Sequence, residues 1–182
     1  ISETDTPNPI SEYGKSKLLG EEILQESKIP SIIIRVSWLY SIFGNNFMKT
    51  IINLSKTKKS INVIDDQIGS PTSANDLAEC ILKIINSKRF SYYAQEKGIF
   101  NFCNSGSCSW YEFAKEILLL TSSDCKVCPI TTDKYNAPAE RPKYSVLNIT
   151  KIKGSFDLEI NSWQIALQNT INSANTNYNK SI

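Results

Sequence analysis

The feature that most constrains the fold is a helical pattern followed directly by a short run of β-branched residues. Apolar side chains recur at helical spacing within residues 11–27, at Leu18, Leu19, Ile23 and Leu24. Pro30 follows the end of this pattern, and residues 31–36 (SIIIRV) are typical of a strand buried on both faces. A helix that leads into such a strand is half of a parallel βαβ unit, so the sequence predicts an α/β fold with a parallel sheet.

The rest of the chain continues this alternation of helices and strands. We expect helices over 47–55, from a cap at Asn75 or Asp76 to residue 85, from a capping box at Ser109 to residue 120, and over 163–174. We expect strands over 61–64, 98–102 and 127–130, a turn over 68–72 and a loop over 133–143. The polar chain from Asn172 onward is expected to fray.

Tyr13 and Lys17 lie one helical turn apart at the start of the first predicted helix, directly after a Pro-containing loop. A phenol beside an ammonium is a plausible proton-transfer pair, because the positive charge favours the ionised phenol. The same interval recurs after Tyr93 and Tyr111, so spacing alone is weak evidence. Tyr93 falls in an expected loop and Tyr111 in an aromatic helix face suited to core packing. Only Tyr13 stands where a loop enters a helix that feeds an apolar strand.

Six segments stand out when they are taken in order along the chain: residues 8–21 (NPISEYGKSKLLGE), 35–40 (RVSWLY), 44–47 (GNNF), 65–72 (DDQIGSPT), 109–114 (SWYEFA) and 141–147 (RPKYSVL). The first is similar to the active-site helix of the extended short-chain dehydrogenase/reductase family. Together the six resemble one branch of that family, the dTDP-4-dehydrorhamnose reductases. Several ordered segments are far more specific than any single one, and the resemblance covers most of the chain.

The resemblance implies the C-terminal part of a doubly wound parallel, Rossmann-type sheet joined to a smaller substrate-binding α/β part. That family begins with a strand, a Gly-rich turn and a helix that hold the dinucleotide pyrophosphate. The seven glycines here are too far apart to form such a turn. We therefore expect the N-terminal Gly-rich half to lie outside this chain. Residues 1–40 and 66–104 would belong to the Rossmann-type domain, 41–65 and 105–174 to the substrate-binding part, and 175–182 to a frayed tail.

The resemblance also implies roles for individual residues. Tyr13 would donate a proton to a C4 keto oxygen, and Lys17 would assist it and bind the nicotinamide ribose, so both are also cofactor-binding candidates. Trp38 would lay its ring against a deoxysugar, with core packing as the alternative. Arg141 suits a bidentate contact with a diphosphate, with a surface loop position as the alternative. Asn46 is a weaker candidate for substrate binding.

Three further features are less decisive. Arg35 closes an apolar strand and could meet either a phosphate or a buried carboxylate. Residues 65–67 are expected to order the loop that leads to Pro71, and their two aspartates lack a third ligand for a metal. Cys125 and Cys128 have zinc-like spacing but no second pair, so the five cysteines are expected to be reduced thiols in the cytoplasm.

Composition excludes several function classes. The absence of histidine rules out a Ser-His-Asp triad, His-ligated zinc and a histidine base within these residues. A net charge of +2 is too small to argue for nucleic acid. No apolar run approaches the roughly 20 residues that cross a bilayer.

The expected function of the intact parent protein is NADPH-dependent reduction of dTDP-4-dehydro-L-rhamnose to dTDP-L-rhamnose, for surface polysaccharide. NADH stays an alternative, because cofactor selectivity would lie outside this chain, and a homodimer is left open. The isolated chain is expected to be inactive. Two other functions compete with this interpretation: a non-catalytic regulatory or binding subunit with a reductase-like fold, and a degenerate fragment. The joint presence of Tyr13, Lys17 and Trp38 argues against the regulatory subunit.

Overall fold

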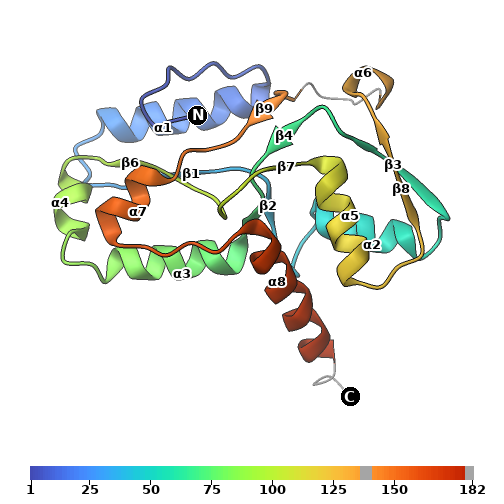
Figure 1. The fold of residues 1–182 in the computed structure, drawn as a ribbon. Helices are drawn as coiled ribbons and strands as arrows, with labels where there is room; N and C mark the ends of the chain where they lie inside the picture. Colours follow the sequence, from blue (N-terminus) through green and yellow to red (C-terminus); the bar gives the residue numbers. More distant parts are fainter. Residues whose placement is uncertain (136–140, 179–182) are drawn as a thin grey trace.

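The computed structural model describes residues 1–135 and 141–178, with the side chains of 175–178 left out (Figure 1). Its helices are α1 (Glu12–Glu26), α2 (Phe47–Ser55), α3 (Ala74–Ile85), α4 (Phe90–Gln95), α5 (Trp110–Leu120), α6 (Thr132–Tyr135), α7 (Thr150–Phe156) and α8 (Trp163–Tyr178). Its strands are β1 (Ile33–Val36), β2 (Leu39–Tyr40), β3 (Ser60–Ile64), β4 (Ile68–Gly69), β5 (Thr72–Ser73), β6 (Ile99–Phe102), β7 (Cys108–Ser109), β8 (Lys126–Ile130) and β9 (Tyr144–Ser145).

The strands pair mostly in parallel, as the sequence predicts. β1 pairs with β6 from Ile33 opposite Ile99, and β3 pairs with β8 from Ser60 opposite Lys126. β2 and β5 form a third parallel pair. β4 lies between β7, which is antiparallel to it, and β9, which is parallel. The α/β class with parallel strands is therefore confirmed, and the β4–β7 pair is a local exception.

The molecule has two hydrophobic cores, one on each side. One is built from α2, α5, α8 and β3, with Phe113 and Leu167 fully buried in it. The other joins α3, β6 and α7 around Phe100 and Ile152. Figure 1 shows this division, with α3, α4, α7, β1 and β6 on one side and α2, α5, β3 and β8 on the other. α7 packs beside β6 although the expected boundaries assign its residues to the substrate-binding part; those boundaries stay a prediction.

Hydrogen bonds at the helix starts follow the local sequence. α5 begins with the predicted capping box: Ser109 Oγ accepts from the Glu112 N–H at 3.0 Å, and Glu112 Oε2 accepts from the Ser109 N–H at 2.7 Å. α3 begins two or three residues earlier than predicted, because Ser73 Oγ accepts from the Asp76 N–H at 3.5 Å. Capping by Asn75 or Asp76 is therefore wrong, since both lie inside the helix.

Two short helices replace expected loops. α4 contains Tyr93, whose ring lies 5.2 Å from the Phe100 ring and 5.1 Å from that of Phe156, so aromatic packing holds a segment that the sequence pattern assigns to a loop. α6 occupies the first residues of the expected loop 133–143. Residues 136–140 of that loop lie outside the described part of the chain. α8 runs past the predicted end at residue 174 to Tyr178.

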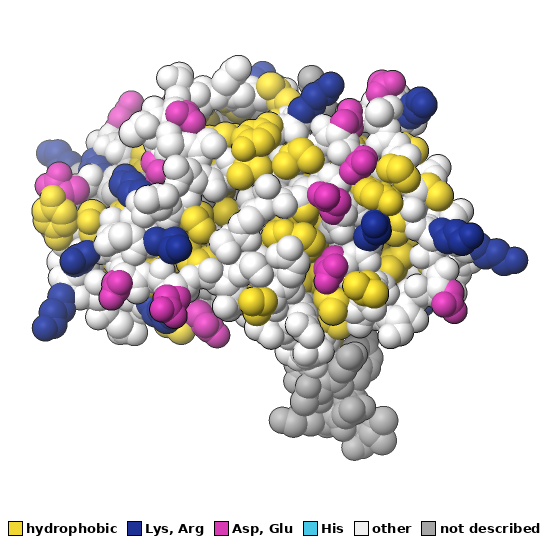
Figure 2. Space-filling view, viewed as in Figure 1, with side chains coloured by type: hydrophobic (Ala, Val, Ile, Leu, Met, Phe, Trp, Pro, Cys, Tyr) yellow, Lys and Arg dark blue, Asp and Glu magenta, His cyan; other side chains and the backbone are white. Residues whose placement is uncertain are grey.

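Among the described residues, no helix combines the length and the apolar character that a bilayer span requires. On the face drawn in Figure 2, basic and acidic side chains are scattered among hydrophobic patches rather than gathered by sign.

Candidate active site

Tyr13 and Lys17 share one accessible face of α1. Lys17 Nζ lies 5.1 Å from the centroid of the Tyr13 ring, which confirms the shared face that the four-residue interval predicts. Tyr13 is 73% exposed, so its phenol is open to a reactant. This arrangement places a phenolic proton donor next to an ammonium, a combination suited to general acid catalysis.

The loop before α1 sets where the helix begins. Ser11 caps the helix by accepting from the Gly14 N–H at 3.1 Å. A Cβ at Gly14 would lie 2.9 Å from the Cβ of Pro9, closer than real side chains approach. The Pro-containing loop therefore packs directly on the first turn of the helix, beside the phenol.

A hollow of about 320 Å³ lies between this helix start and β1. Its lining residues are Pro7, Asn8, Pro9, Gly14, Lys17, Leu18, Glu21 and Arg35. The ammonium of Lys17 and the amide of Asn8 are the kinds of group that hydrogen-bond sugar hydroxyls. The hollow therefore offers groups that can hydrogen-bond a sugar, and its role in holding the nicotinamide ribose stays a prediction.

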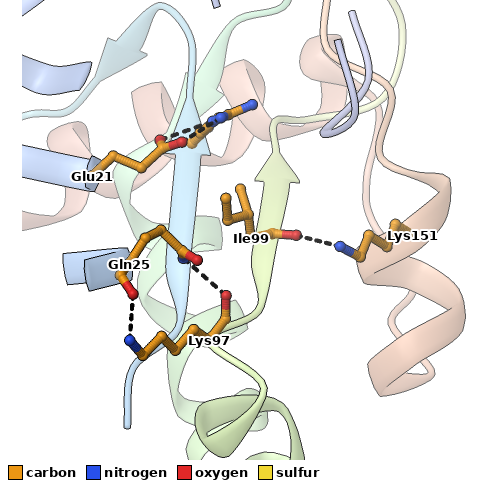
Figure 3. A network of polar contacts seen from close by, with 6 residues as sticks. Glu21, Gln25, Lys97, Ile99 and Lys151 are labelled. Atoms are coloured by element: carbon orange, nitrogen blue, oxygen red, sulfur yellow. Dashed lines mark hydrogen bonds and ion pairs between the residues drawn. The ribbon is translucent and has the colours of Figure 1, made fainter. Parts of the chain in front are cut away.

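The structure resolves which partner Arg35 meets. Its guanidinium binds both carboxylate oxygens of Glu21, with Nε donating to Oε2 at 3.0 Å and Nη2 donating to Oε1 (Figure 3). The hydrogen bond with Glu21 raises the pKa of Arg35 above its ordinary value. Both side chains are largely removed from solvent, so Arg35 ties β1 to α1 through a carboxylate.

Trp38 lies between an aromatic ring and a glycine. Its ring stacks on Trp110 of α5, with centroids 3.5 Å apart and planes 9° from parallel. A Cβ at Gly69 would lie only 2.4 Å from Trp38 Cε2, so this position on β4 has no room for a side chain. The backbone of Trp38 has φ of 46°, a left-handed conformation that bulky residues rarely adopt. Such strain is often found at functional sites.

A cavity of about 370 Å³ opens beside Trp110. Its lining residues are Phe47, Thr50, Ile51 and Leu54 of α2, Ile61, Asn62, Val63 and Ile64 of β3, and Gln67, Trp110, Tyr135 and Arg141. A mostly apolar cavity with a few polar groups at its margin is the usual form of a small-molecule site. Arg141 is exposed and contributes the cavity's positive charge.

Asn46 is engaged within its own loop. Its Oδ1 accepts from the Lys49 N–H at 3.2 Å and so caps α2. Its Nδ2 donates to the carbonyl of Ser41 at 2.7 Å. These bonds give Asn46 a structural role, and its contact with a substrate stays a prediction.

Residues 65–67 order the chain that leads to β4, as the sequence predicts. Asp65 Oδ1 accepts from Ser109 Oγ at 2.6 Å. Asp66 Oδ1 accepts from Thr132 Oγ1 at 2.6 Å and from the Thr132 N–H at 2.8 Å, and this hydroxyl bond lowers the pKa of Asp66. Gln67 Nε2 donates to the same hydroxyl at 3.1 Å. The segment thereby fixes α6 at the rim of the cavity.

The candidate residues fall into two groups. Trp38, through Trp110, adjoins the cavity that Arg141 lines. Lys17 lines the hollow together with Arg35 of β1, and Tyr13 lies on the same face of α1 as Lys17. Trp38 lies two residues after the end of β1. Sequence reasoning missed Trp110 as a site residue and assigned its segment to core packing. Its place in the segment 109–114, which carries part of the family resemblance, is the signal that could have found it.

The cysteines provide no metal site in the part of the chain that the structure describes, where no group of three or more cysteine, aspartate or glutamate side chains could hold an ion. All five cysteines are free. Burial raises the pKa of Cys80 to about 11 and that of Cys108 to about 12. Cys80 packs in the second core, as the sequence predicts.

Comparisons with known proteins agree on one family. The family model described as RmlD substrate binding domain matches residues 1–176. The chain is 39% identical over 166 residues to the Bacillus subtilis spore coat polysaccharide biosynthesis protein SpsK, covering 91% of this chain and 56% of that protein. It is 37% identical to dTDP-4-dehydrorhamnose reductase of Sinorhizobium fredii, covering 89% of this chain and 56% of that protein.

Solved structures show the same similarity. A dTDP-4-dehydrorhamnose reductase from Bacillus anthracis, in complex with NADP, matches with a TM-score of 0.85 and 39% identity, over 94% of this chain and 58% of that one. The corresponding reductase from Clostridium acetobutylicum matches with a TM-score of 0.86 and 41% identity, over 96% and 60%. The chain therefore spans somewhat more than half the length of these relatives.

Proposed function

Because this chain belongs to the RmlD substrate binding domain family, we propose that the intact protein reduces the C4 ketone of dTDP-4-dehydro-L-rhamnose to give dTDP-L-rhamnose, with NADPH as reductant. The observation that carries this proposal is the accessible Tyr13–Lys17 pair beside a hollow that reaches β1. Relatives that bear the reductase name, one of them with bound NADP, support it. NADH remains the alternative reductant.

The residues of this chain would supply the proton for the keto oxygen and the positive charge that stabilises the resulting phenolate. NADPH, when bound, supplies the hydride to C4. Tyr13 holds a proton on its phenolic oxygen and gives it to the keto oxygen, so that the ketone becomes a hydroxyl and the phenol a phenolate. The ammonium of Lys17, which lies 5.1 Å from the centroid of the Tyr13 ring, would stabilise that phenolate and hydrogen-bond the ribose.

The cavity beside Trp110 would bind the nucleotide part of the substrate. Its apolar walls, including Phe47 and Trp110, suit the thymine ring, and Gln67 offers an amide at its margin. Arg141 would pair with the diphosphate through its planar guanidinium. The deoxysugar would then extend past Trp38 toward Tyr13.

The same proposal assigns the residues of this chain to two domains of the intact protein. Residues 1–40 and 66–104 would complete a Rossmann-type domain with a Gly-rich segment supplied from outside this chain, and 41–65 with 105–174 would cover the substrate. The isolated chain would turn over no substrate, because backbone N–H groups of a Gly-rich turn are needed to hold the pyrophosphate. We place the reaction in the cytoplasm, where NADPH and dTDP-sugars are available.

A direct test measures ketone-dependent loss of NADPH absorbance with the full-length protein that contains this chain. The Tyr13→Phe variant keeps the ring but cannot donate a proton, so kcat should fall by roughly 10²–10⁴-fold while dTDP still binds. Tyr92→Phe is the matched control, because Tyr92 is also an exposed tyrosine, 63% accessible. Turnover by Tyr13→Phe at the rate of the control would remove Tyr13 from the mechanism.

A further inference from the structure

The helix that carries Tyr13, α1, contacts the rest of the described chain largely through polar side chains. None of its residues is buried within the described structure. Its half-buried residues after the first turn are Leu18, Glu21 and Gln25, which recur at helical spacing and so mark the face turned toward β1 and β6. Two of these three side chains are polar. Among the described residues, polar contacts are therefore the specific ones that set α1 against β1 and β6.

The contact at the end of the helix comes from Lys97, which lies just before β6. The Lys97 ammonium donates to the carbonyl of Gln25 (Figure 3) and to the carbonyl of Ser27. In return, Gln25 Nε2 donates to the Lys97 carbonyl at 3.0 Å. The last turn of α1 has no basic residue of its own, so Lys97 supplies the cation that the carbonyl end of a helix favours.

The backbone of Lys97 forms the left-handed turn that ends α4. Lys97 has φ of 49°, a left-handed conformation in which Gly, Asn and Asp are the favoured residues. A lysine at this position tolerates that backbone while its ammonium meets two carbonyls of another element. The neighbouring Gly98 N–H donates to the Tyr93 carbonyl at 2.8 Å, so α4 holds the turn in place.

The setting of α1 decides where the Tyr13 phenol lies. The Glu21–Arg35 pair and the Gln25–Lys97 pair fix the second half of the helix at two heights one turn apart. A rotation of about 10° around the helix axis would move a side-chain tip by about 1 Å. A misplacement of that size can cost about 10²-fold in rate.

We propose that Lys97 is a positioning residue for Tyr13 and Lys17, which acts by clamping the carboxyl end of α1 to the entry of β6. The proposal rests on the proposed function, because it assigns to the clamp the task of aiming the proton donor. Lys97 lines neither the hollow beside Lys17 nor the cavity beside Trp110.

The test compares Lys97→Met with Lys97→Arg in the full-length protein. Met keeps the apolar stem and removes the charge, and Arg restores a cation. We expect Lys97→Met to lower kcat by about 10- to 100-fold with the KM for the dTDP-sugar unchanged, and Lys97→Arg to recover part of the loss. The solvent deuterium isotope effect on kcat should rise, because transfer of the Tyr13 proton becomes slower. Lys88→Met, at an exposed lysine, is the matched control.

A second readout needs no turnover. Fluorotyrosine placed at position 13 should change its fluorine NMR shift in Lys97→Met, whereas fluorotyrosine at position 111 should not. Tyr111 is the matched site because Lys115 Nζ also lies over its ring, at 5.4 Å. An unchanged resonance at position 13, or a kcat loss that only follows the folded fraction with no rise in the isotope effect, would overturn the proposal. A wild-type protein that reduces no ketone would refute the proposed function instead, and the resonance alone would then decide whether Lys97 positions Tyr13.

Discussion

Trp38 and Trp110 form a parallel stack, with ring centroids 3.5 Å apart, that joins the chain after β1 to the start of α5. Phe47 adds a tilted contact to Trp110 at 4.5 Å. The stack therefore connects the strand that leads away from α1 with the cavity that Arg141 lines. A substrate that spans both would contact Trp38 between its nucleotide and its reacting carbon.

Gly69→Ala should disturb this stack. The added Cβ would lie 2.4 Å from Trp38 Cε2 and 2.7 Å from Ser145 Oγ, so the Trp38 ring must move. We expect a loss of about 1–3 kcal/mol in the free energy of unfolding of the full-length protein, together with a higher KM for the dTDP-sugar. Gly154→Ala is the control, because no atom lies within 4 Å of its Cβ position. Equal denaturation midpoints for the two variants would contradict the close approach at Gly69.

Arg141→Ala should weaken binding of dTDP more than binding of thymidine. Loss of a charge-assisted hydrogen bond to the diphosphate costs roughly 1.5–3 kcal/mol, and thymidine has no phosphate to lose. Isothermal titration of both ligands into the full-length protein measures the difference. Lys134→Ala on α6 controls for the loss of a nearby positive charge, since Lys134 is exposed and does not line the cavity. Equal losses for dTDP and thymidine would place Arg141 away from the phosphates.

The sequence predicts the elements well where local rules dominate. The capping box of α5 and the shared face of Tyr13 and Lys17 depend on residues within one turn, so spacing alone identifies them. The cap of α3 is harder, because several consecutive residues can cap a helix and packing around Ser73 decides among them.

Contacts between distant segments are the part that the sequence leaves open. Arg35 has no local signal to choose between a phosphate and a carboxylate, and Glu21 becomes its partner only because α1 packs along β1. The sequence pattern assigns Trp110 to core packing, and only the structure shows that its ring stacks on Trp38. These pairings depend on how helices and strands assemble, which spacing within one segment does not encode.

The buried cysteine thiols should react more slowly with a thiol reagent than the half-buried ones. Burial raises the pKa of Cys108 to about 12, so at neutral pH it carries roughly a thousandfold less thiolate than a free cysteine. Cys80 and Cys103 are buried in the same way, and their pKa values are also raised. We expect a thiol reagent to modify Cys125 and Cys128 first in the native full-length protein, as peptide mapping would show. Modification of Cys80 at the same rate would mean that its core opens readily.

The hydrogen bonds between Asp66 and Thr132 should make stability depend on pH in the acidic range. The Thr132 hydroxyl and N–H lower the pKa of Asp66 in the folded protein, so the unfolded chain binds a proton more readily at this site. The stabilisation is therefore fully present above the unfolded value, near 3.8, and is lost as pH falls through the lower folded value.

Asp66→Asn tests this dependence, because the amide oxygen is a weaker acceptor that does not titrate. At neutral pH the Tm of Asp66→Asn should lie below that of the wild-type full-length protein. The difference should shrink as the pH is lowered below about 4, because the wild type loses the carboxylate that distinguishes it. Asp124→Asn is the control, at an exposed aspartate, and should show no such convergence. A Tm difference that stays constant from neutral to acidic pH would show that the two hydrogen bonds do not favour the ionised Asp66.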